Sequence, residues 1–291
     1  MAKVSASAAI GAAFNSVGSG WRAAWGALLL YLVANFTFQL WAASLSGWAA
    51  NLNSPGAMAA HLGELQSLPL LLILLVGAGL SAYGALYRAN LDQADENGPA
   101  GLQWRAGEWR ILGAMFVLSL AALPLILLWG AVFGMAAAGA RSGSVAAAAS
   151  MAMVMGFTSI VVLIAAPLLI WVSIRLSPFL AATIDQRKIV TFGVWRLTAG
   201  NFWAIFGALF VVGLAAFGVS LVSSVVAFAV RASEGAMLHA TPAQLIVPSL
   251  IQSAAVVVLL PAKVGLMSHV YRSLRPGESV AEVLASSVHD R

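Results

Sequence analysis

Residues 201–230, NFWAIFGALFVVGLAAFGVSLVSSVVAFAV, contain no charged side chain, and Arg231 ends the run. A helix needs about 20 mostly apolar residues to cross a bilayer, so this stretch is long enough to span one. The whole chain has a matching composition: of its 291 residues, 61% are hydrophobic and 9% are charged, whereas a soluble domain carries roughly 25% charged residues. The sequence therefore predicts a polytopic membrane protein and excludes a soluble or disordered chain.

Five further apolar runs of similar length occur along the chain. They cover residues 23–49, 67–87, 111–140, 145–174 and 245–270. All are continuous and rich in Ala and Leu, whereas the strands of a membrane barrel alternate over segments of about 10 residues. A helix satisfies its own backbone hydrogen bonds in lipid. The sequence therefore predicts an all-α fold, an integral membrane helical bundle of six transmembrane helices.

The basic residues are distributed unevenly over the segments that join these runs. Two of the 15, Arg141 and Arg231, fall in the first, third and fifth loops, and the others lie in the N-terminal arm, the second and fourth loops and the C-terminal end. Because segments rich in Lys and Arg stay inside, we predict that both termini lie in the cytoplasm. A cleavable signal peptide at the first run is the alternative, but that run exceeds the apolar core of about 7–15 residues in such peptides.

The six runs fall into three similar pairs. Three runs begin with Gly26-Ala27-Leu28, Gly113-Ala114-Met115 and Gly207-Ala208-Leu209, and three end at Arg88, Arg175 and Arg272. The first glycine and the closing arginine of a pair are 62, 62 and 65 residues apart. This regularity predicts three two-helix hairpin repeats, at about 8–90, 100–177 and 183–275, in one membrane domain (1–275) with a cytoplasmic tail (276–291). The alternative is chance, because Gly-Ala pairs are common in Ala-rich helices and an arginine can end any span.

Tryptophan and arginine stand side by side ahead of each predicted repeat. The pairs are Trp21-Arg22, Trp104-Arg105, Trp109-Arg110 and Trp195-Arg196, and Trp203 follows the last of them. Upstream of the first pair, Ile10, Phe14, Val17 and Trp21 recur at helical spacing. This spacing predicts a short amphipathic helix lying in the interface, and similar lead-in helices are expected before the other two repeats.

These residue types suit the headgroup region of a membrane. An indole ring places its apolar body toward lipid and its N–H toward water, and a guanidinium can hold a phosphate through two hydrogen bonds. We therefore predict that the Trp-Arg pairs and Trp203 anchor the chain at the lipid headgroups, and that Arg88, Arg175 and Arg272 are the basic ends of the repeats. Two interpretations stay open: simple anchors of helix ends, or a selective phospholipid headgroup site.

Lys263 is the one charged residue inside a predicted span. A lysine at the centre of a bilayer costs about 2.5–3.5 kcal/mol on insertion scales. Lys263 lies nine positions before Arg272, so its long side chain can extend to the cytoplasmic headgroups. It is either such an anchor, following Pro261, or a cation lining a cavity for an anionic lipid or substrate.

Residues 178–203 resemble a known family. The stretch Phe192-Gly193-Val194-Trp195-Arg196-Leu197-Thr198-Ala199-Gly200-Asn201-Phe202-Trp203 follows Pro178-Phe179-Leu180-Ala181-Ala182-Thr183-Ile184-Asp185 and a basic turn. It resembles the polytopic membrane domain fused to some bacterial glycerophosphodiester phosphodiesterases, and that domain's stand-alone relatives; Asp185 stands where the family more usually has Glu. The family's hydrolase activity belongs to a separate soluble domain, which we do not expect in the short segment after residue 270. The resemblance thus implies a multi-pass protein of the bacterial cytoplasmic (inner) membrane, with a lipid-related role and no hydrolase activity.

The sequence contains no motif for catalysis or metal binding. There is no Cys, the four His residues lack metal-ligand spacing, and neither a GxSxG elbow nor a P-loop occurs. Asp92, Asp95 and Glu96 precede Asn97-Gly98-Pro99, which predicts a solvated turn rather than a cation site. No catalytic residue, metal or cofactor is therefore predicted.

These observations favour a non-enzymatic integral membrane protein that interacts with lipid or serves as an accessory or scaffold subunit of a membrane complex. The expected partners are phospholipids and either another membrane protein or a second copy of the chain. The net charge of +5 is explained by the cytoplasmic loops, so no nucleic-acid binding is expected. A transporter or lipid flippase is the alternative, because internal repeats occur in transporters. Against it, no acidic residue falls inside a predicted span, and ion-coupled transport usually needs one.

Overall fold

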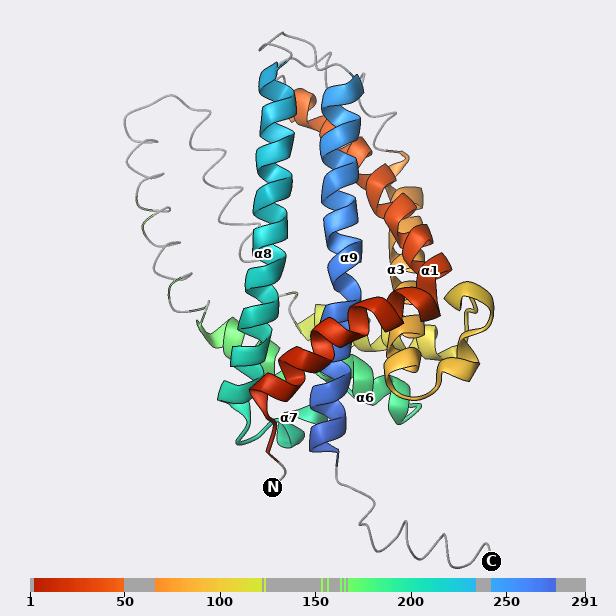
Figure 1. Ribbon diagram of the computed structural model, residues 1–291, viewed down its shortest axis with the longest axis vertical. Helices are drawn as coiled ribbons and strands as arrows, with labels where there is room; N and C mark the ends of the chain where they lie inside the picture. The colour runs from red at the N-terminus through yellow and green to blue at the C-terminus, as the bar shows by residue number, and fades with distance from the viewer. Residues whose placement is uncertain are drawn as a thin grey trace, which may run out of the picture.

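Helices make up the described chain. The computed structural model describes residues 3–49, 66–121, 167–233 and 242–275, with single positions at 123, 153, 156, 163 and 165 (Figure 1). The long helices are α1 (Ala6–Ala49), α3 (Leu68–Asn90), α8 (Phe202–Ser233) and α9 (Pro242–Leu274). The shorter ones are η1 (Ala94–Asn97), η2 (Pro99–Gly101), α6 (Phe179–Asp185), α7 (Val194–Leu197) and the segments 106–121 and 167–176. These residues include no strand, so the predicted all-α class is confirmed for them.

Five helical segments are long and apolar enough to cross a membrane. They are Ala6–Ala43, Leu68–Asn90, Pro167–Asp185, Phe202–Val226 and Leu245–Leu274, and the third of them contains a turn at residues 177–178. Their number confirms the prediction of a multi-pass helical membrane protein. The predicted third and fourth spans, 111–140 and 145–174, lie largely outside the described residues, as does the tail 276–291. The arrangement of six spans in three repeats therefore stays a prediction.

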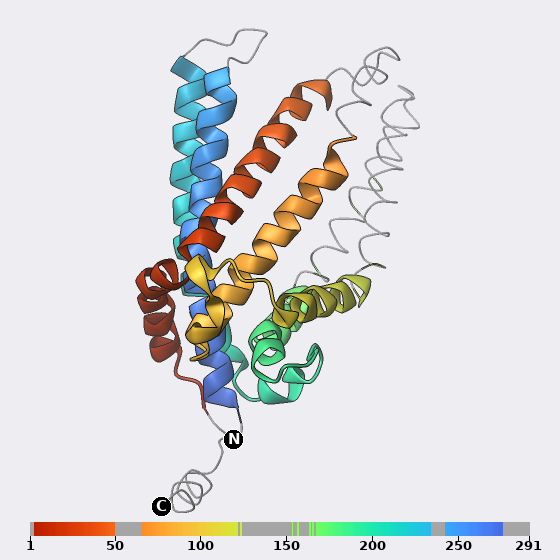
Figure 2. The same ribbon diagram turned by 90° about the vertical axis from the view of Figure 1, so that its right-hand side faces the viewer.

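The long helices stand together as a bundle. α8 and α9 run side by side in opposite directions, and α1 and α3 pack beside α9 (Figures 1 and 2). Between them lie fully buried side chains such as Leu28, Leu86 and Tyr271. The outer face of α8 instead exposes large aromatic residues, with Phe217 at 64% and Phe228 at 74% of their surface. A soluble protein rarely exposes a continuous apolar face of this kind, whereas lipid tails are as apolar as the side chains they touch.

The first helix changes direction at Ala24, whose backbone angles (φ −137°, ψ 25°) are not helical. The half of α1 before this bend crosses α9, and the half after it runs along the bundle (Figure 1). The predicted lead-in helix is thus present, but its most buried stripe differs from the predicted one. Small residues form that stripe, namely Ala9, Ala13, Ser16 and Gly20, while Phe14 is 45% exposed and Ile10, Val17 and Trp21 are partly buried beside it.

Small residues allow α1 and α9 to approach each other closely. The Ser16 hydroxyl donates a hydrogen bond to the Pro261 carbonyl at 2.7 Å. A Cβ atom added to Gly265 would overlap the Ser16 side chain, and one added to Gly20 would lie 2.9 Å from both Leu86 Cδ2 and Pro261 Cβ. Close approach of backbones through small residues is the usual way in which membrane helices associate. The crossing therefore explains why the buried stripe is small rather than large and apolar.

Candidate functional site

α1 and α8 begin, and α3 and α9 end, at the same end of the bundle (Figures 1 and 2), and many basic residues of the chain lie in the segments that meet there. We call this the basic end and define it by Arg88, Arg105, Arg110, Arg175, Arg187, Lys188, Arg196, Arg272 and Arg275. Ion pairs across its elements join Arg272 to Asp92 at 2.7 Å and Arg187 to Glu96 at 2.8 Å. The fold thus assembles one charged surface from segments that are far apart in sequence.

Arg88, the predicted end of the first repeat, is part of a buried ion pair. Its side chain is 3% exposed, that of Glu108 is 0% exposed, and Arg88 Nη1 lies 2.6 Å from Glu108 Oε1. Arg88 Nε donates to Asn97 Oδ1 at 2.8 Å, and Nη2 donates to the Gln103 carbonyl at 3.4 Å. Removing one partner of a buried pair leaves an uncompensated charge, which is strongly destabilising. Arg88 therefore holds the segment that follows α3 against the end of that helix.

Glu108 has a second role at the start of helix 106–121. Its Oε2 accepts a hydrogen bond at 2.8 Å from the backbone N–H of Arg105, which is the carboxylate half of a capping box. Gly84 of α3 makes room for this carboxylate, because a Cβ atom there would overlap Glu108 Oε1. Our sequence reasoning missed Glu108. The signal that could have found it is the capping-box spacing: Glu108 stands three positions after Arg105, the residue just before the helix.

Arg175, the predicted end of the second repeat, lies against a pair of indole rings that contact each other. Its guanidinium carbon is 5.5 Å from the centre of the Trp171 ring and 5.7 Å from that of Trp195. The two rings meet edge to face with their centres 4.9 Å apart, and Arg175 Nη1 donates to the Trp195 carbonyl at 3.4 Å. A cation over an aromatic face is attracted by about 0.5–2 kcal/mol. Trp195 thus pairs with Arg175 rather than only flanking Arg196, and sequence analysis missed Trp171.

Arg272, the predicted end of the third repeat, is exposed and contacts the end of the first. Its Nη1 lies 2.7 Å from Asp92 Oδ2, and Nη2 donates to the Asn90 carbonyl. Together with Glu96, Asp92 belongs to the acidic turn that follows α3. The prediction that this turn is simply solvated misses its ion pairs with Arg272, Arg105 and Arg187.

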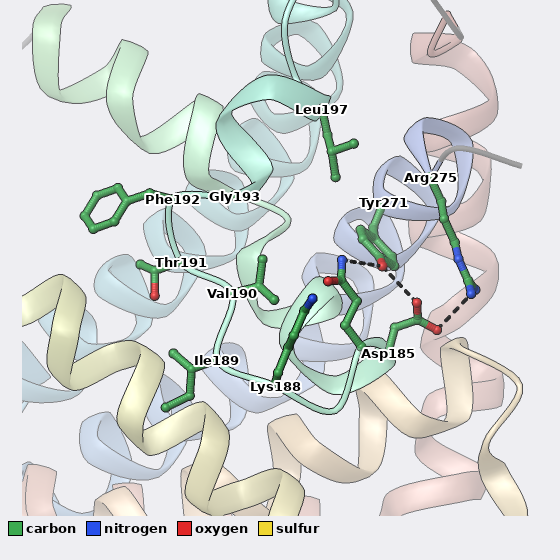
Figure 3. Close-up of a pocket in the computed structure, with 11 residues that line it drawn as sticks. Asp185, Lys188, Ile189, Val190, Thr191, Phe192, Gly193, Leu197, Tyr271 and Arg275 are labelled. Atoms are coloured by element: carbon green, nitrogen blue, oxygen red, sulfur yellow. Dashed lines mark hydrogen bonds and ion pairs between the residues drawn. The ribbon is translucent and has the colours of Figure 1, made fainter.

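One cavity at the basic end lies between α6, the segment that follows it and the end of α9 (Figure 3). Its volume is about 840 Å³. Asp185 is the centre of a polar network on its wall: the Tyr271 hydroxyl donates to Asp185 Oδ2 at 2.8 Å, and Arg275 Nη1 lies 3.3 Å from Asp185 Oδ1. Lys188 extends into the space from the opposite side (Figure 3).

This network joins α6 to the end of α9, and its central carboxylate is fully engaged in hydrogen bonds. Both carboxylate oxygens of Asp185 accept hydrogen bonds. The segment beyond it is tied back to α6 by the Val190 N–H, which donates to the Thr183 hydroxyl at 3.2 Å. Within the described parts of the chain, no group of three His, Cys, Asp or Glu side chains is arranged to hold a metal ion.

The stretch that carries the family resemblance joins three parts of the fold. The Thr198 hydroxyl donates to the Arg175 carbonyl at 3.0 Å, and Asn201 Oδ1 accepts a hydrogen bond from the Val4 N–H at 2.9 Å. Gly200 between them has a positive φ of 81°, which a residue without Cβ adopts at little cost. These residues connect the N-terminal segment, the segment ending at Arg175 and the start of α8, so their contacts are structural.

The other predicted anchoring residues are divided between surface and core. Trp104, Trp109 and Trp203 are 40%, 62% and 76% exposed, and Arg196 is exposed as well. Trp21 is partly buried against the core, and Arg22 Nε donates only to the Gly18 carbonyl, at 3.3 Å. The anchoring roles themselves stay predictions, because no lipid is present.

Lys263 is exposed on α9. It lines neither of two cavities at the basic end, nor the groove beside it that Ala12 and Gly265 help to form. No described carboxylate forms an ion pair with it. This position agrees with the snorkelling anchor better than with the cavity cation.

Comparison of the chain with known proteins gave no match among protein-family models, curated proteins or solved structures. Function must therefore be argued from the geometry of the basic end.

Proposed function

We propose that the chain is a non-enzymatic multi-pass membrane protein that binds anionic phospholipid at its basic end. The observation that supports this most directly is the excess of positive charge there. Nine basic side chains define the basic end, and the carboxylates near them are Asp92, Asp95, Glu96, Glu108 and Asp185. Each basic residue near an anionic leaflet contributes about 1 kcal/mol of attraction, so four unbalanced charges are enough to enrich such lipids locally.

The tryptophans of the basic end support the same proposal. Trp104, Trp109 and Trp203 are exposed, and exposed indoles are stable at the headgroup level of a bilayer. Apolar faces such as that of α8 belong deeper in the lipid. Indole rings and guanidinium groups at the same end of the bundle therefore match one membrane interface.

Orientation is part of the proposal: the basic end faces the cytoplasm of a bacterial cell, and the chain lies in the inner membrane. The chain has no Cys, so single cysteines can be introduced without a background. Lys188→Cys at the basic end should resist an impermeant maleimide in intact cells, and Gln66→Cys ahead of α3 should react. The opposite pattern would refute the orientation.

Lipid binding is tested by mild extraction and native mass spectrometry of everything retained. We expect anionic phospholipid to be enriched over its share of the membrane, and to be less enriched in the double variant Lys188→Gln/Arg196→Gln. Arg231→Gln near the end of α8 is the control, because it removes a charge at the other end of the bundle. Retention of lipids in their bulk proportions would refute the proposal, and a membrane protein retained in fixed stoichiometry would support an accessory or scaffold role instead.

Kinship with the membrane domain of glycerophosphodiester phosphodiesterases is also a proposal. It rests on residues 192–203 and on the six-span layout predicted from the sequence. The alternative function, transport or lipid scrambling, predicts flux in vesicles reconstituted with the purified chain, whereas the proposed function predicts none.

A further inference from the structure

A second, smaller cavity at the basic end is lined by four arginines. Its volume is about 250 Å³, and it lies between the end of α3, the start of helix 106–121 and the segment after α6. Arg88, Arg105, Arg110 and Arg187 line it together with Glu96. Pockets for drug-sized ligands start at about 300 Å³, so this volume suits a single small ionic group.

The charges around this cavity do not balance. The carboxylate of Glu108 forms an ion pair with Arg88. Glu96 is shared, with Oε1 2.8 Å from Arg187 Nη2 and Oε2 3.8 Å from Arg105 Nη1. Arg110 forms no ion pair with a described carboxylate. Four guanidinium groups thus face two carboxylates, and the cavity keeps two positive charges in excess.

Two of the donors around this cavity are held in place before any ligand arrives. Arg88 is fixed by its buried contacts, and Arg105 Nη2 donates to Gln103 Oε1 at 2.8 Å. Arg105 Nε is buried and has no hydrogen-bond partner in the described structure, which leaves a desolvated donor uncompensated. Ala106 and Gly107, the first residues of helix 106–121, also line the cavity. The first N–H groups of a helix lack partners within it and attract anions.

We propose that this cavity binds the phosphate of a phosphomonoester. A phosphomonoester carries about −1.5 to −2 charges at neutral pH, which matches the excess of two, whereas a phosphodiester carries a single charge. Guanidinium groups bind phosphate oxygens through paired hydrogen bonds. The inference rests on the proposed function and narrows it from anionic lipids in general to one headgroup chemistry.

The surroundings of the cavity indicate where the phosphate comes from. Trp104 and Trp109 each precede an arginine that lines the cavity; both are exposed, and their ring centres lie 5.6 Å apart. Exposed indoles belong at the headgroup level, so we expect a lipid with a phosphomonoester headgroup. Free inorganic phosphate offers the same chemistry, so the experiment must distinguish it from the lipid as the source of the bound group.

The test uses the full chain in nanodiscs of phosphatidylcholine. These carry equal small amounts of phosphatidylglycerol, a phosphodiester, and phosphatidate, a phosphomonoester, and native mass spectrometry measures the lipid that stays bound. We expect phosphatidate to be retained about tenfold better than phosphatidylglycerol, because one additional hydrogen bond between charged groups changes affinity by at least about that factor. Arg110→Gln should abolish this preference. Arg231→Gln, which removes a charge near the other end of the bundle, should leave it unchanged.

Folding of the variant is checked by its melting temperature without phosphate. This temperature should equal that of the wild type, because Arg110 forms no ion pair with a carboxylate in the described part of the chain. Arg187→Gln, at a side chain that is 66% exposed, is the second variant and should weaken phosphatidate retention in the same direction. If neither variant lowers retention more than Arg231→Gln does, the proposal is wrong.

The remaining outcomes separate the two sources and the two proposals. Inorganic phosphate that raises the melting temperature of the wild type but not of Arg110→Gln, with no preference between the lipids, would support the cavity and assign it to free phosphate. A preference for phosphatidylglycerol over phosphatidylcholine, with no further preference for phosphatidate and no effect of phosphate, would overturn this inference alone. Retention of neither anionic lipid above phosphatidylcholine would overturn the proposed function as well.

Discussion

Glu108→Gln separates the charge of the buried pair from its shape. The amide keeps the volume of the carboxylate, and its oxygen can still accept a hydrogen bond, but it cannot neutralise Arg88, whose side chain is 3% exposed. Arg88 would keep only neutral acceptors, namely the new amide oxygen, Asn97 Oδ1 and the Gln103 carbonyl. Breaking a buried ion pair in this way costs about 3–5 kcal/mol, so we expect the free energy of unfolding to fall by that amount.

The measurement is reversible unfolding in mixed micelles, followed by the fluorescence of the 10 tryptophans. Glu96→Gln is the matched control, because that carboxylate is 35% exposed and its partner Arg187 is 66% exposed. Ion pairs at such exposed sites contribute about 0–1 kcal/mol. In the double variant Arg88→Met/Glu108→Met no charge is left unpaired, so it should be more stable than the sum of its single variants by about 0.5–3 kcal/mol. Equal losses for Glu108→Gln and Glu96→Gln would refute the reasoning.

Two further substitutions test packing, one at the crossing of α1 and α9 and one at the basic end, each with its own control. Gly265→Ala should lower the free energy of unfolding by about 1–3 kcal/mol, because the new methyl group overlaps the Ser16 side chain. Gly207→Ala is the control and should be neutral or stabilising, because its new methyl group meets nothing within 4 Å. Similar losses for both variants would contradict the close crossing of α1 and α9. Trp171→Leu should destabilise by about 0.5–2 kcal/mol through the lost cation–π contact, whereas Trp203→Leu at a 76% exposed site should not, and the melting temperatures of the two variants decide this.

The spans were predictable because their length is a local property. Residues 67–87, 201–230 and 245–270 were expected as spans, and the helices run over Leu68–Asn90, Phe202–Ser233 and Pro242–Leu274. Lipid offers no partner for backbone polar groups, so an uncharged run of sufficient length becomes a helix whatever its neighbours are. The contacts of other elements hardly enter this decision.

The packing face of the lead-in helix was not predictable in the same way. Helical spacing of Ile10, Phe14 and Val17 pointed to a face of large apolar residues, whereas the structure buries the small residues beside them. In water the largest apolar side chains are buried first, but between membrane helices close contact of backbones decides. The buried face therefore has the helical spacing that the sequence predicts, but it lies one position earlier in the chain than the predicted face.

Pairing at the basic end depended on tertiary contacts that adjacency in sequence does not reveal. Trp195 and Arg196 are neighbours in the chain, yet the indole lies over Arg175. Glu108 was overlooked because an acidic residue in a mixed segment is usually solvated, and only the approach of Gly84 and Arg88 from α3 buries it.

The three closing arginines differ in environment but follow one rule of connection. Arg88 contacts Glu108, and Arg175 contacts the Trp195 carbonyl; in both cases the partner is 20 residues further along, in the lead-in to the next predicted repeat. Arg272 has no later repeat to contact and instead pairs with Asp92, just after the end of the first. Each closing arginine thus ties its own unit to another one. Two of the three contacts share one spacing, as a repeat would predict, and the three-repeat arrangement itself stays a prediction.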